Sequence, residues 1–246
     1  MDDYPYEYYN RKRSESKAFF RKCLVFFVAM IVIVVLAVLV FCRPQSKTFG
    51  VWLYFVAADV SAGSAETVAS EIAEKGGAGT LFSFGETELP LYACYYTKED
   101  AEKITKRLAD AGESAIVKEK KAGSLYFAGV DEKKAKEEVC ALVQTAYESS
   151  VVLFDIANGL EDKTLSSRNA LYAAEECMDV FLYAAEQVRA LTVFEKKALR
   201  TYFSFFEEAE SFSDSLKTDG ITCQGARRMQ TELCCFFLSS FEMFGK

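Results

Sequence analysis

The sequence predicts an α+β protein in three parts: a transmembrane helix, a two-layer βαββαβ domain and an all-α antiparallel helical bundle. Three observations lead to this prediction: an uncharged apolar run near the N-terminus, a helical motif that occurs twice in the middle, and a C-terminal half without proline. The expected segments are a cytoplasmic tail (1-22), the transmembrane helix (23-42), the βαββαβ domain (48-128) and the bundle (131-246).

The apolar run extends from Cys23 to Cys42 and contains no charged residue, Gly or Pro. A helix of this length, rising about 1.5 Å per residue, spans the roughly 30 Å hydrocarbon core of a bilayer. Cations concentrate on its N-terminal side, namely Arg11, Lys12, Arg13, Lys17, Arg21 and Lys22. The positive-inside rule therefore predicts a single span with a cytoplasmic N-terminus and extracytoplasmic C-terminal domains.

The composition excludes several functions. The 246 residues include no His, which removes Ser/His/Asp and Cys/His nucleophilic sites and the usual imidazole metal sites. We therefore expect no enzyme, no catalytic residue, no cofactor and no metal. The net charge of -7 argues against nucleic acid as a partner, because that role needs clustered Lys and Arg.

The motif A-E-x-[VI]-x-x-x-[IL]-A-x-x-G occurs after Ser64 and again after Asp100. Its apolar positions have helical spacing, and each copy ends in glycine. Ser64 can cap the first helix, and Thr97 or Asp100 the second. Two short amphipathic helices are therefore predicted.

Each predicted helix lies between two runs of strand character. An aromatic-rich, alternating run precedes it, and a short apolar run follows it. The four runs are Phe49 to Val56, Thr80 to Phe84, Leu91 to Tyr96 and Ala115 to Val117. The order is βαββαβ, and both helices are expected on one face of a four-stranded antiparallel sheet with the other face open.

The alternation of side chains along the strands assigns residues to these two faces. We expect Leu53 and Phe55 to pack on the helices. The residues expected on the open face are Trp52, Tyr54, Tyr92 and Tyr96. They would form an aromatic platform suited to stacking on sugar rings or to a protein contact. The alternative is that a third layer, formed by the C-terminal region, covers this face.

A membrane anchor, a linker and a βαββαβ unit with A-E-x-[VI] helices together resemble the SPOR (sporulation-related repeat) domain of bacterial envelope and cell-division proteins. The resemblance covers about Thr48 to Ala122. It implies that the open sheet face binds the glycan strands of peptidoglycan. It also implies a location in the bacterial cell membrane and a task in cell-wall, division or sporulation processes.

The C-terminal half has no proline from Asp131 onward. Apolar residues at helical spacing predict four helices, at about 131 to 158, 165 to 190, 192 to 216 and 224 to 244. These apolar stripes are interpreted as a packed core. We expect the bundle to be structural, to fold by itself and to contact envelope or division proteins.

Two functional hypotheses remain open at this point. In the first, the protein is a membrane-anchored envelope protein that binds peptidoglycan through Trp52, Tyr54, Tyr92 and Tyr96. In the second, the protein is an interaction scaffold of a membrane complex, and its SPOR-like sheet has lost glycan binding and contacts protein.

Overall fold

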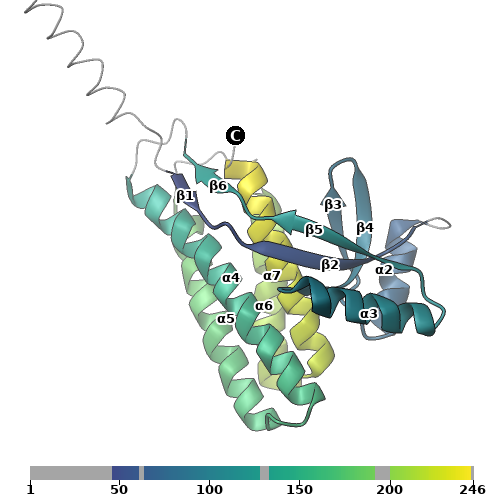
Figure 1. The fold of residues 1–246 in the computed structure, drawn as a ribbon. Coiled ribbons are helices and arrows are strands. Elements are labelled where there is room, and N and C mark those ends of the chain that lie inside the picture. Colours follow the sequence, from purple (N-terminus) through teal and green to yellow (C-terminus); the bar gives the residue numbers. More distant parts are fainter. Residues whose placement is uncertain (1–45, 61–63, 128–132, 192–199, 245–246) are drawn as a thin grey trace, which may run out of the picture. The chain divides into compact units, whose positions relative to one another are not determined.

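The computed structural model describes residues 46–60, 64–127, 133–191 and 200–244 (Figure 1). These residues belong to one compact unit, Ser46–Lys246, of mixed α+β class with more helix than strand. The predicted tail 1-22 and transmembrane helix 23-42 lie outside the described residues. The segments 48-128 and 131-246, which the sequence predicts as separate domains, share a single hydrophobic core.

The sheet region has the βαββαβ order that the sequence predicts. Its elements are β2 (Trp52–Ala58), α2 (Ala65–Glu74), β3 (Thr80–Phe84), β4 (Thr87–Tyr95), α3 (Lys98–Asp110) and β5 (Ala115–Lys121). The strands are antiparallel in the spatial order β3-β4-β2-β5, so the first and third strands of the motif lie in the centre. Figure 1 shows α2 and α3 beside these strands.

Both predicted helix starts are capped by hydroxyl groups. The Ser64 hydroxyl accepts a hydrogen bond from the Thr67 amide at 3.3 Å, and the Thr97 hydroxyl accepts one from the Asp100 amide at 3.2 Å. These bonds satisfy amides that have no partner within the first helical turn. The cap of the second helix is therefore Thr97, one of the two candidates that the sequence offered.

A short two-stranded ribbon accompanies the sheet and was not predicted. Strands β1 (Ser46–Thr48) and β6 (Ser124–Tyr126) pair in antiparallel fashion, and the hydroxyl oxygens of Thr48 and Ser124 lie 2.6 Å apart. Strands of three residues are too short to produce a recognisable alternation in the sequence.

The bundle contains the four helices that the sequence predicts, with bounds shifted by a few residues where both are described. They are α4 (Lys133–Glu161), α5 (Ser167–Arg189), α6 (Arg200–Asp219) and α7 (Cys223–Phe244). The first residues of the helix predicted at 192 to 216 lie outside the described part of the chain. Helix α4 packs against both α5 and α7.

Among the described helices, α4 is long and apolar enough to cross a membrane, judged by length and composition. Its buried residues recur at helical spacing and belong to the shared core, as Val139, Val143 and Leu153 illustrate. This buried face accounts for the hydropathy of α4, because a bundle helix surrounded by neighbours requires a broad apolar surface.

The bundle covers one face of the sheet. Leu53, Phe55 and Leu91 are fully buried in the same core as residues of α4 and α7, and α7 contacts β3, β4 and β6. The opposite face, with Val56 and Ala58, packs on α2 and α3. The prediction that Leu53 and Phe55 face α2 and α3 was wrong, and so was the prediction of an open second face. Strands with apolar residues on both faces require a layer on each side, and the alternative of a C-terminal third layer is confirmed.

Candidate functional site

The four aromatic residues that the sequence predicts as one platform lie in different surroundings. Trp52 and Tyr54 alternate with the bundle-facing Leu53 and Phe55, so they lie on the α3 side of β2. Tyr92 is buried on that same side, whereas Tyr96 packs against the core shared with the bundle. The prediction of one shared, open face for all four rings was wrong.

A β-bulge between the two central strands explains this difference. Val56 pairs with Ala93, but its neighbour Ala57 pairs with Leu91, so Tyr92 is the additional residue. One additional residue reverses the alternation of every side chain that follows it. Tyr92 and Ala93 therefore face the same helices, and Tyr96 turns toward the bundle.

Tyr96 connects the sheet to the bundle. Its hydroxyl oxygen lies 2.7 Å from Ser150 Oγ on α4, and its ring meets the rings of Tyr147 and Phe154 edge to face. Gln230 on α7 donates a hydrogen bond to the Cys94 carbonyl at 3.2 Å. Burial raises the pKa of the Tyr96 phenol, which stays neutral in this setting. These contacts give Tyr96 a structural role.

Tyr92 also has a structural role, on the opposite face of the sheet. Its hydroxyl donates to Glu113 Oε2 at 3.2 Å, and Lys75 Nζ lies 2.5 Å from Glu113 Oε1. Burial, together with the Glu113 charge, raises the pKa of Tyr92 to about 12. The three side chains join the end of α2 to β4 and to the turn before β5.

Trp52 and Tyr54 remain the accessible part of the predicted platform. Trp52 is 45% exposed, and Lys121 Nζ lies 5.5 Å from the centre of its ring. Tyr54 is half-buried and pairs across the sheet with Glu119. We call Trp52, Tyr54, Lys98, Glu119 and Lys121 the β2–β5 patch.

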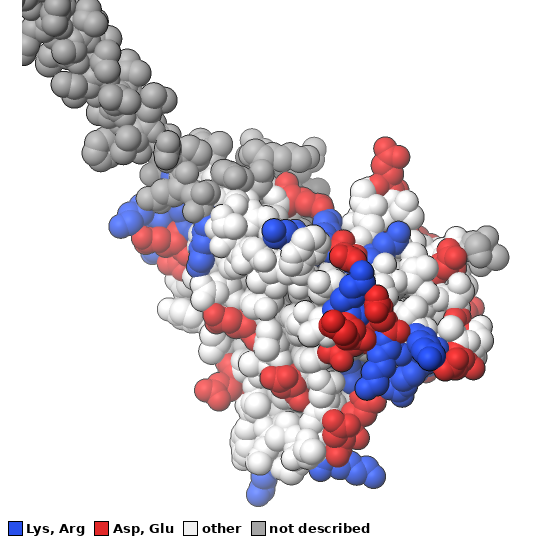
Figure 2. Space-filling view, in the orientation of Figure 1, with Lys and Arg blue, Asp and Glu red and all other residues white. Residues whose placement is uncertain are grey.

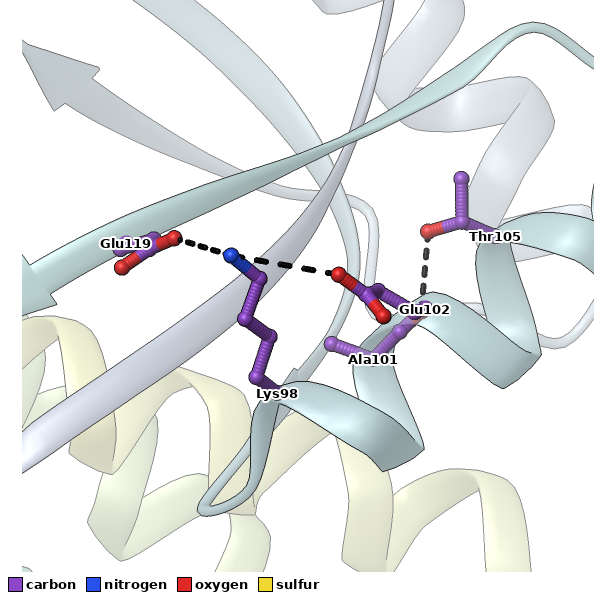
Figure 3. Close-up of polar contacts among 5 residues, drawn as sticks. All are labelled: Lys98, Ala101, Glu102, Thr105 and Glu119. Atoms are coloured by element: carbon purple, nitrogen blue, oxygen red, sulfur yellow. Dashed lines mark hydrogen bonds and ion pairs between the residues drawn. The ribbon is translucent and has the colours of Figure 1, made fainter.

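Ion pairs hold the charged part of the β2–β5 patch in place. Lys98, at the start of α3, points toward β5, and its Nζ lies 2.9 Å from Oε1 of Glu119 on that strand (Figure 3). The same Nζ lies 3.9 Å from Oε1 of Glu102, one turn further along α3. In the same helix, Thr105 donates a hydrogen bond to the Ala101 carbonyl at 2.9 Å. Aromatic rings beside fixed carboxylate and ammonium groups can stack on and hydrogen-bond to a polar ligand.

A second accessible surface lies on α5 and was not predicted from the sequence. The large apolar side chains Tyr172, Val180 and Tyr183 are 62%, 54% and 66% exposed. Glu176 and Asp179 lie between them and are also exposed. The sequence did contain a signal for this surface: Tyr172, Val180 and Tyr183 are spaced so that they lie on one face of the helix. The buried residues Ala174, Met178 and Phe181 lie on the opposite face.

A groove of about 670 Å³ between α6 and α7 is lined by several carboxylates. One of them, Glu232, is almost fully buried, and its Oε1 accepts a hydrogen bond from Arg228 Nε at 3.0 Å. Burial raises the pKa of Glu232 because the ionised form loses hydration, and the single Arg228 partner, itself largely exposed, only partly compensates.

Glu232→Gln should therefore stabilise the protein at pH 7 and leave its stability unchanged near pH 4. The folded state holds the Glu232 proton more tightly than the unfolded state, so stability falls as pH rises above the unfolded pKa. Thermal denaturation at the two pH values tests this expectation. A variant that melts below wild type at pH 7 would show that the ion pair with Arg228 outweighs the loss of hydration.

The cysteines that the structure describes are free thiols. Cys94, Cys234 and Cys235 are buried, and burial raises the pKa of Cys94 and Cys235. Within the described ranges, no three metal-ligating side chains of His, Cys, Asp or Glu lie close enough to hold an ion.

Comparisons with known proteins identify no relative: the chain matches no family model, no curated protein and no solved structure. A proposal about function therefore depends on the chemistry of the protein's exposed surfaces. Two surfaces qualify, the β2–β5 patch and the exposed face of α5, because both expose large aromatic side chains to solvent.

Proposed function

We propose that this protein is a non-catalytic, single-pass membrane-anchored scaffold of the bacterial cell envelope, whose SPOR-like sheet and helical bundle together hold protein partners. Residues 23-42 form the anchor, the N-terminus is cytoplasmic, and the folded unit is extracytoplasmic. The observation that supports this proposal most strongly is the burial of the bundle-facing side of the sheet against α7. In the SPOR resemblance, the sheet face opposite the two helices is the one that binds glycan.

A glycan strand could reach that face only if the bundle moved away. Exposing a buried Leu or Phe side chain costs about 1.5–3 kcal/mol, so exposing Leu53, Phe55 and Leu91 costs about 5–9 kcal/mol. A ligand with micromolar affinity contributes about 8 kcal/mol of binding free energy. Because the apolar side chains of α7 would be exposed as well, glycan binding on this face is unfavourable.

The second candidate function is peptidoglycan binding through the β2–β5 patch. The exposed Trp52 ring favours this possibility, since an indole ring can pack on the apolar face of a sugar while Lys121 and Glu119 contact hydroxyl groups. The accessible aromatic area is small, however, because Tyr54 is half-buried, Tyr92 is buried and Tyr96 faces the bundle.

Sedimentation with purified peptidoglycan sacculi separates the two candidates. We expect the full-length protein, in mild detergent, to stay in the supernatant, and Trp52→Ala to behave in the same way. We also expect a protein partner to co-purify with it from its own membranes in a fixed ratio. Tyr172→Ala is the control variant, because it removes a ring that is more exposed than Trp52 and lies far from the sheet in sequence.

The outcome that contradicts the scaffold proposal is specific. If sacculi retain the wild type and Tyr172→Ala but release Trp52→Ala, the β2–β5 patch binds glycan and the second candidate is correct.

A further inference from the structure

Within the part of the chain that the structure describes, the outer face of α5 is exposed and carries a regular pattern. Its inner face packs on α4 and α6, with Ala174, Met178 and Phe181 buried. On the outer face, exposed residues recur every three or four positions, with Asp179 and Val180 side by side in the middle, so they form one band along the helix axis. We call this band the α5 stripe: Tyr172, Glu176, Asp179, Val180, Tyr183 and Glu186.

The apolar members of the α5 stripe are unusually accessible. Single exposed apolar residues are common on protein surfaces, but three large ones on one face of a helix offer one partner several apolar contacts. Two of them are tyrosines with 62% and 66% of their surface exposed. Tyr is enriched at protein interfaces because its ring supplies apolar area and its hydroxyl group can form a hydrogen bond.

The charges within the α5 stripe are all acidic, and the basic residues of α5, Arg168 and Arg189, lie at the two ends of the helix. Segments 139–160 of α4, 169–188 of α5 and 201–216 of α6 contain acidic residues but neither Lys nor Arg. On the face of the bundle turned to the viewer, Figure 2 shows carboxylates scattered over uncharged surface, with basic residues gathered at the two ends of the helices. A partner that buries the tyrosines therefore needs positive charge at its rim.

We infer that the α5 stripe is the docking site for a cationic amphipathic helix of a partner protein. Apolar residues of that helix pack between Tyr172, Val180 and Tyr183, and its flanking Lys or Arg residues pair with Glu176 and Asp179. This inference rests on the proposed scaffold function and names the surface and the chemistry of its partner. A helix matches the stripe because the three apolar side chains extend over three turns of α5.

The same charges disfavour the other occupants of an apolar surface. A second copy of the chain, docked stripe to stripe, would bring Glu176 and Asp179 against their own copies, and like charges at an interface reduce affinity. An anionic membrane surface is repelled for the same reason.

A defined probe tests the inference on the full-length protein in phosphatidylcholine nanodiscs. The probe is a fluorescent synthetic helix of about 20 residues, with a Leu row flanked by Lys. A matched peptide carries Glu at every Lys position, and empty nanodiscs measure binding to lipid. Fluorescence anisotropy is expected to show saturable binding of the Lys peptide and none of the Glu peptide.

Two double variants locate the binding site. Tyr172→Ala with Tyr183→Ala should weaken the Lys peptide about tenfold or more, because it removes both rings. Glu176→Lys with Asp179→Lys should weaken it by a similar factor at low salt. The matched control reverses two exposed acids at the ends of α2 and α3, Glu74→Lys with Asp110→Lys, and should change affinity less than about twofold.

Four results would overturn the inference. Equal binding of the two peptides, or equal effects of the stripe and control variants, would show that the stripe is not selective. Dimers that dissociate only in the tyrosine variant would assign the stripe to a second copy. Binding that equals that of empty nanodiscs would assign the peptide to lipid. If any of these occurs while a partner still co-purifies with the full-length protein, only the docking site is wrong and the scaffold function stands.

Discussion

Phe237→Ala should lower the free energy of unfolding of the full-length protein by about 3–5 kcal/mol, the usual cost of removing a buried Phe ring. Phe237 on α7 is fully buried. Its ring centre lies 5.4 Å from that of Phe49, 5.2 Å from that of Tyr147 and 5.0 Å from that of Phe241. The ring therefore joins α4, α7 and the segment before β2, and its loss leaves a cavity where these elements meet.

Urea denaturation in mild detergent, followed by circular dichroism, measures this change. Tyr172→Ala is the matched control, because it removes a ring of similar size from an exposed position and should change stability by about 0.5 kcal/mol or less. Similar losses in the two variants would mean that the shared core contributes less than its burial indicates.

The bundle alone, residues 130–246, should fail to form a monomer with a cooperative melt. In the whole protein, α7 packs against β3, β4 and β6, and its buried residues share one core with Leu53, Phe55 and Leu91 of the sheet. Removal of the sheet exposes that surface and leaves Gln230 without the Cys94 carbonyl and the Tyr96 hydroxyl. A large exposed apolar surface leads to aggregation or to loss of fixed packing.

Size-exclusion chromatography and thermal denaturation of this fragment test the prediction. A monomer that melts cooperatively near the temperature of the full-length protein would contradict it, and would support the independent folding that the apolar stripes suggest.

The sequence by itself determined the local elements. Helix starts depend on groups a few residues apart, such as the hydroxyls of Ser64 and Thr97 and the amides that they cap, so they can be recognised without knowledge of the fold. The same holds for the βαββαβ order and for the four helices of the bundle, because hydrophobic periodicity is a local property. For the second face of the sheet, the sequence predicted an open surface and offered a third layer from the C-terminal region only as the alternative.

Only the tertiary structure decided which layer covers which face, and with it the accessible surfaces. The bulge at Tyr92 depends on the pairing of β4 with β2, and one additional residue was enough to turn Tyr96 from an expected ligand contact into a link to α4. The placement of α7 on the sheet is a contact between segments far apart in the chain, and no local pattern specifies it. The hydrophobic effect is non-directional, so an apolar face in the sequence indicates that some other surface covers it but does not specify which one.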